Sequence, residues 1–119
     1  MKNEKRTWLY ELILLAVLVM AAYFRFMGVN WDESQHLHPD ERFLTMVESG
    51  LAPAHSLSEY FDTANSPLNP HNRGYGFFVY GDFPIVIVRY LAEWMGQTGY
   101  DEVVLVGRQV SALADLGVI

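Results

Sequence analysis

The feature that most constrains this chain is an apolar segment of twenty residues, Trp8 to Met27. Its central part, from Leu12 to Phe24, contains no charged side chain and therefore has no polar face to turn toward water. Twenty helical residues reach about 30 Å, which matches the thickness of the hydrocarbon core of a bilayer. The segment predicts a transmembrane helix over residues 8–27.

Two alternatives to a transmembrane helix are open for the same segment. A cleaved signal peptide would also have a basic head and an apolar middle, with Ala21 and Ala22 as a cleavage site. The long apolar run and the following Arg25 and Phe26 disfavour it. A buried helix of a soluble protein is disfavoured because the run has no polar face.

The distribution of charge predicts the orientation of this helix. Lys2, Lys5 and Arg6 precede it, so the positive-inside rule places residues 1–7 in the cytoplasm and residues 28–100 outside. The external stretch carries nine acidic residues against three arginines, and the chain has no basic stripe, which excludes a nucleic-acid-binding module. The absence of cysteine excludes a disulfide framework and a thiolate site.

The rest of the sequence predicts a mainly α membrane fold. It has a first transmembrane helix, an external loop with short amphipathic helices, and the start of a second transmembrane helix over residues 101–119. The apolar pattern reaches Ile119 without a stop signal, so we expect the chain to be part of a longer protein. The helices expected in the loop cover residues 39–49 and 84–95, with a short amphipathic turn at 57–61. Residues 75–80 are predicted to form either a strand or a segment on the membrane surface.

A pair of acids marks the start of the first loop helix. Pro39 can occupy the first helical position, which places Asp40 and Glu41 in the first turn. Exposed amides and the helix dipole there favour ionised carboxylates. A carboxylate held at this position could act as a general base toward an attacking hydroxyl. The alternative is that both acids are ordinary residues of a first helical turn.

A metal site is a second possibility in the same region. In an extended segment His36, His38 and Asp40 would point the same way and could supply three ligands to a divalent metal. The alternative is that both histidines are solvated in a loop. No other cofactor is predicted. A second acidic pair, Asp32 and Glu33, is predicted to lie in a solvated loop.

Taken together, four segments resemble the N-terminal part of polytopic glycosyltransferases of the C superfamily. They are the helix over 8–27, Pro-Asp-Glu-Arg-Phe at 39–43, Tyr-Gly-Asp-Phe-Pro at 80–84 and Arg-Gln-Val-Ser-Ala-Leu at 108–113. Within this superfamily the segments resemble those of the family 39 protein O-mannosyltransferases and of the aminoarabinose transferases of lipid A. The chain departs from their pattern at Phe83-Pro84, because the loop of these proteins commonly has two consecutive prolines there. Similar openings also occur in a related group of large uncharacterised membrane proteins.

The resemblance implies transfer of a sugar, with inversion, from a polyprenyl-phosphate donor in the membrane lipid to an acceptor hydroxyl. It implies that Asp40 is the base or the carboxylate that orients the acceptor, and that Glu41 supports it or binds the acceptor. The donor phosphate requires positive charge. Further phosphate-binding residues are expected beyond the end of this chain. The candidates within it are Arg42, Arg89 and Arg108.

The competing interpretation is a membrane-anchored, non-catalytic module whose acidic external domain binds a partner. It predicts that the natural protein stops near Ile119. The glycosyltransferase interpretation predicts many further apolar segments after this residue, and it predicts that the 119-residue piece is inactive alone.

Overall fold

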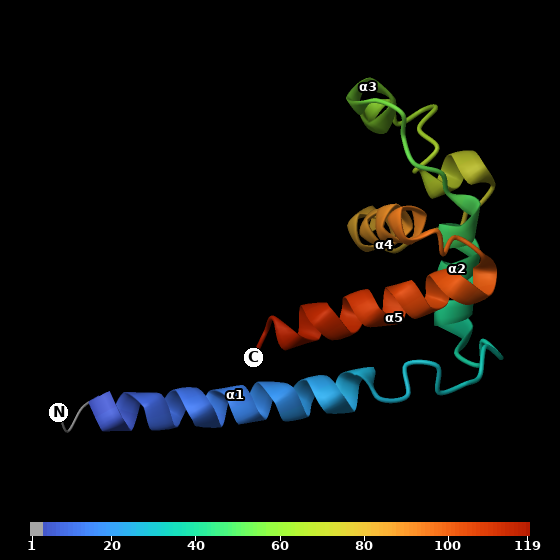
Figure 1. The fold of residues 1–119 in the computed structure, drawn as a ribbon. Helices are drawn as coiled ribbons and strands as arrows, with labels where there is room; N and C mark the ends of the chain where they lie inside the picture. Colours follow the sequence, from blue (N-terminus) through green and yellow to red (C-terminus); the bar gives the residue numbers. More distant parts are fainter. Residues whose placement is uncertain (1–3) are drawn as a thin grey trace. The chain divides into compact units, whose positions relative to one another are not determined.

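The computed structural model describes residues 4–119 of the chain, and side chains from Thr7 onward. The described part is mainly helical and contains no strand, as Figure 1 shows. This confirms the mainly α class and shows that the strand considered for residues 75–80 is wrong. The elements are α1 (Glu4–Phe26), α2 (Pro39–Gly50), α3 (Leu57–Phe61), the 3₁₀ helix η1 (Pro70–Arg73), α4 (Asp82–Met95) and α5 (Tyr100–Leu116).

The chain forms two compact units. One contains the residues up to Val29 together with Arg108–Ile119, and the other contains Asn30–Gly107. The division falls within α5, eight residues into the helix, whereas the sequence suggested a boundary at its start. We refer to Asn30–Gly107 as the loop unit.

In the first unit, α1 is long and apolar enough to cross a membrane over Thr7–Phe26. Its apolar side chains are mostly half exposed or more, for example Leu12 at 50% and Phe24 at 69%. Near its end, Arg25 forms an ion pair with Asp115 of α5 and also donates to the Ala21 carbonyl at 3.3 Å. Residues 1–3 of the predicted cytoplasmic head lie outside the described residues.

The core of the loop unit lies where α2 and α4 pack together. Val47 and Leu51 from α2 and its C-cap meet Ile85 of α4 and Phe78 of the preceding loop, and all four are at least 95% buried. Their burial follows from the apolar spacing of α2, which places Val47 on one face with Phe43 and Leu44 beside it. Figure 1 shows α4 beside α2.

The loop between α3 and α4 is ordered by side-chain amides. Asn69 and Asn72 both donate to the Thr63 carbonyl, at 2.8 and 3.1 Å, and Asn72 also donates to the Ser66 carbonyl at 3.0 Å. Asn69 accepts from the His71 amide and so caps η1. A segment that the composition predicts as an irregular loop therefore has a fixed shape, because Asn side chains supply the missing backbone partners.

Candidate functional site

The predicted acid pair lies in the first turn of α2. The backbone of His38 is extended, as its position before Pro39 requires, and its Nδ1 atom accepts from the Glu41 amide at 3.4 Å. The Asp40 side chain is exposed, and that of Glu41 is half-buried. The arrangement presents one carboxylate, that of Asp40, to solvent at a helix start.

The three candidate arginines have different surroundings. Arg42, next to the acid pair, is exposed, and within residues 4–119 no ion pair involves it. Arg108 donates to the Val29 carbonyl at 2.7 Å within the first unit. Of the three, Arg42 is the one whose guanidinium is both near Asp40 in the chain and open to solvent.

Arg89 of α4 has an internal role in the loop unit. It is 8% exposed and donates to the carbonyls of Glu48 and Ser49, at 3.2 and 3.5 Å, and to the Glu93 carboxylate at 2.9 Å. These carbonyls belong to the last turn of α2, where intrahelical donors run out, and the Glu48 carbonyl also accepts from the Leu51 amide at 3.3 Å. The guanidinium therefore satisfies the C-terminal end of α2 from a neighbouring helix, and little of it is left for a phosphate.

Glu48 is a buried acid that the sequence analysis did not single out. Its side chain lies on the inner face of α2, 7% exposed, toward Gly107 of α5. Burial first, and the nearby charge of Glu41 second, raise its pKa from 4.5 to about 8. Glu48 is therefore protonated at neutral pH, so Glu41 does not face a second ionised acid there. Glu48 follows Glu41 by seven residues, or about two helical turns, so both acids lie on the same face of α2. This spacing is the sequence signal that could have pointed to Glu48.

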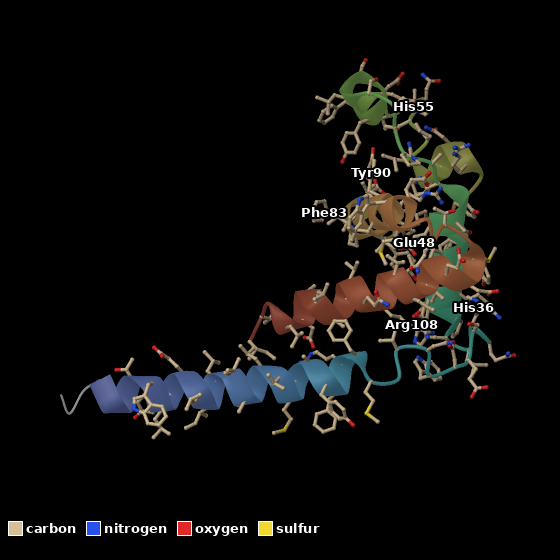
Figure 2. The ribbon with its side chains drawn as sticks, viewed as in Figure 1. His36, Glu48, His55, Phe83, Tyr90 and Arg108 are labelled. Carbon is tan, nitrogen blue, oxygen red and sulfur yellow. The ribbon has the colours of Figure 1, made fainter. Side chains whose placement is uncertain are left out.

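His36 is buried and held by two residues of α5. Its Nε2 atom lies 2.8 Å from Asp101 Oδ1, and its ring stacks on Tyr100 at a centroid distance of 4.2 Å. Its Nδ1 atom is buried without a hydrogen-bond partner among the described residues. Figure 2 shows His36 beside the first turns of α5.

The conformation of this segment changes the metal prediction. His36 has a φ of +50°, so the segment is not extended there and the alternation that would align His36, His38 and Asp40 is broken. Within residues 4–119 no group of three potential ligands comes together. The premise of a His-x-His-x-Asp ligand set was therefore wrong.

The turn before α2 is also less solvated than predicted. Asp32 is 5% exposed and accepts from the Leu37 amide at 3.4 Å, so the solvated loop predicted for it is wrong. Glu33 is exposed, as predicted. Glu33, Ser34 and His36 have φ values between +50° and +62°, a conformation that costs a non-glycine residue about 1–3 kcal/mol. Buried polar contacts from Asp32 and His36 hold this strained path into α2.

A hollow of about 310 Å³ lies between α3, η1 and the start of α4. Its lining combines polar and apolar surface and includes neither Asp40 nor Glu41. The lining residues are Tyr60, Thr63, Ser66, Leu68, Asn69, His71 and Asp82. The acid pair is therefore a surface feature of the loop unit and not the lining of this hollow.

Chemically, this part of the loop unit can offer an exposed carboxyl group from Asp40, a second carboxyl group from Glu41 and the guanidinium of Arg42. Comparison of the chain with protein-family models, curated proteins and solved structures finds no match.

Proposed function

We propose that this chain is the N-terminal part of an integral membrane glycosyltransferase that moves a sugar from a polyprenyl-phosphate donor to an acceptor hydroxyl. The observation that carries the proposal is the exposed Asp40 in the first turn of α2, fourteen residues after the end of an apolar helix of membrane-spanning length. The sequence resemblance in the segments 39–43, 80–84 and 108–113 supports it.

In this proposal Asp40 takes the proton of the acceptor hydroxyl or orients that hydroxyl for attack on the anomeric carbon. The helix start stabilises the ionised carboxylate that such a role requires. Glu41 binds the acceptor or supports Asp40. Arg42 and Arg108 are the candidates for the donor phosphate, whereas the contacts of Arg89 favour a structural role.

The proposal includes a topology, with residues 1–7 in the cytoplasm and residues 28–100 outside. It is supported by Lys2, Lys5 and Arg6 before the apolar segment. A reporter that is active only outside the membrane, fused after Gly50 of the full-length protein, should be active. A reporter confined to the cytoplasm would contradict the orientation.

The decisive experiment is Asp40→Asn in the full-length protein, assayed in membranes with polyprenyl-phosphate sugars. Loss of a general base lowers rates by about 10²–10⁴-fold, and asparagine keeps the size and helix-start preference of aspartate. The control is Glu33→Gln, which removes an exposed acid that lies outside every segment of the resemblance. Asp32 is unsuitable as a control because it is buried and accepts from the Leu37 amide.

Equal transfer rates for Asp40→Asn and wild type would show that Asp40 has no catalytic role and is an ordinary residue of a first helical turn. A full-length protein that transfers no sugar, and instead captures a partner through the acidic loop unit, would favour the non-catalytic anchored module.

A further inference from the structure

The hollow between α3, η1 and the start of α4 has a buried base and an open polar rim. The base is formed by Ser66 and Leu68, which are 3% and 4% exposed. The other lining residues are exposed or half-buried, and we refer to them as the rim: Tyr60, Thr63, Asn69, His71 and Asp82. A volume of about 310 Å³ is at the small end of the range for small-molecule sites, about 300–1,000 Å³.

Most of the rim is not used by the fold. Within residues 4–119, four of its side chains take part in no hydrogen bond and no ion pair: those of Tyr60, Thr63, His71 and Asp82. The two other polar lining residues, Ser66 and Asn69, bond to the backbone of the loop itself. Four polar groups of different chemistry therefore line one hollow and remain available to a ligand.

The loop that carries this rim is held in one shape by its own amides. Asn72 donates to the Thr63 and Ser66 carbonyls, and Asn69 caps η1. The remaining rim residues lie on α3, η1 and α4. A ligand would meet side chains on a framework that is already ordered, so binding costs less conformational entropy.

The chemistry of the free groups matches a ligand that is rich in hydroxyls. The Tyr60 and Thr63 hydroxyls each donate and accept, the imidazole of His71 bonds at both nitrogens, and the carboxyl oxygens of Asp82 accept. A sugar hydroxyl also donates and accepts, so it can pair with each of these groups. The rings of Tyr60 and His71 add flat apolar faces for the carbon skeleton of such a ligand.

Other ligand classes fit the hollow less well. The loop unit carries eleven acidic residues against three arginines, a formal net charge of −8, which opposes an anion. Among the lining residues only His71 and Asp82 are usual metal ligands, and no group of three potential ligands comes together in the described part of the chain. A purely apolar ligand would cover polar groups without pairing them, which costs free energy.

The hollow lies at the opposite end of α2 from Asp40. The segment that carries η1 meets the C-terminal end of α2, where the Ala52 amide donates to the Pro67 carbonyl at 3.3 Å. Figure 1 shows α3 beyond this end of α2, whereas Figure 2 shows His36, which precedes α2, near the other end. The step from Asp40 to Gly50 covers about 15 Å of helix, so a ligand in the hollow does not occupy the position of Asp40.

We propose that this hollow is a binding site for a neutral, hydroxyl-rich ligand of one or two sugar rings. The inference goes beyond the proposed function and does not depend on it, because binding here requires neither Asp40 nor a transfer reaction. It gives the loop unit a second site, at which a carbohydrate is held without being altered.

Saturation-transfer difference NMR measures this binding on the full chain in phosphatidylcholine nanodiscs, and titration of the signal gives the Kd. The probes are three neutral sugars, glucose, maltose and lactose, with glucosamine and glucuronate as charged analogues of glucose. Two variants change the rim with little change of shape, Asp82→Asn and Thr63→Val. The controls are Glu33→Gln, which removes an exposed acid outside the hollow, and Asp40→Asn. Circular dichroism checks that each variant keeps its helix content.

At least one neutral sugar should bind with a millimolar Kd. Each rim variant should raise that Kd about 3–10-fold, as expected for the loss of one hydrogen bond, and both controls should leave it unchanged. Absence of binding by all three neutral sugars, or a Kd that both rim variants leave unchanged, would overturn the proposal.

Two other results would also contradict it. Tighter binding of glucosamine or glucuronate than of glucose would show that the site selects a charged ligand. A Kd raised by Asp40→Asn would place the sugar at the start of α2 and not in the hollow. All of these measurements are independent of transfer activity, so a failure here is distinguishable from a failure of the proposed function.

Discussion

Replacing Glu48 by glutamine should stabilise the loop unit at neutral pH. The folded protein keeps a proton on Glu48 up to about pH 8, whereas the unfolded chain releases it above its ordinary pKa of 4.5. Above pH 4.5 the unfolded state therefore binds fewer protons, and wild-type stability falls as pH rises toward 8. Each pH unit in this window costs about 1.4 kcal/mol, so the cost at pH 7 is about 3 kcal/mol. Glutamine has the shape of the neutral acid and avoids this cost.

The assay is urea unfolding of the whole chain in neutral micelles, followed by far-UV circular dichroism at several pH values. With a slope of about 1 kcal/mol per M urea for a unit of this size, Glu48→Gln should raise the midpoint by up to about 3 M at pH 7. At pH 4.5 the two midpoints should nearly coincide, because folded wild type holds the proton and half of the unfolded molecules hold it too, which leaves a cost of only about 0.4 kcal/mol. The control is Glu33→Gln, at an exposed position.

The reasoning fails if Glu48→Gln gains nothing at pH 7, or if its gain is the same at pH 4.5 and pH 7. An equal gain in Glu33→Gln would show that reduced net charge, and not burial of this carboxyl group, is responsible.

Two further substitutions test the packing described above. Gly50→Ala should destabilise the loop unit by about 1–3 kcal/mol in the same urea assay, because the new Cβ would lie 2.5 Å from the Tyr75 hydroxyl, which donates to the Met46 carbonyl; an unchanged midpoint would mean that Tyr75 moves freely. His36→Phe keeps a ring against α5 but removes the bond to Asp101, so we expect a loss of about 1–3 kcal/mol by thermal unfolding. Full stability of this variant would show that the bond contributes little.

The helices of the loop unit were predictable because local signals agree with their packing. The start of α2 at Pro39 follows from proline chemistry, and its end at Gly50 is one residue beyond the prediction. The prediction for α4 began two residues late because Asp82 and Phe83 precede the proline taken as its start. The predicted helix at the chain end was too long, since α5 stops at Leu116.

The polar contacts that shape the candidate site were not predictable in the same way. His36 and Asp101 are 65 residues apart, and no local pattern marks either as a partner of the other. The left-handed conformation of His36 depends on that contact, so the extended segment assumed for a metal site could not be tested from sequence. Burial of Asp32 and Glu48 likewise depends on neighbours supplied by the folded unit, whereas local composition favours exposure of both.

The bonds from Arg89 to the last turn of α2 bear on how the loop unit assembles and opens. Arg89 donates to two α2 carbonyls that lie 40 and 41 residues earlier in the chain, so these bonds to the C-terminal turn of α2 form only when α4 docks. Undocking α4 would break both bonds at once, while Arg89 keeps Glu93 on its own helix and the Glu48 carbonyl keeps the Leu51 amide. The two helices should therefore exchange their amide protons as one cooperative block, slower than α3, whose five residues bury no side chain.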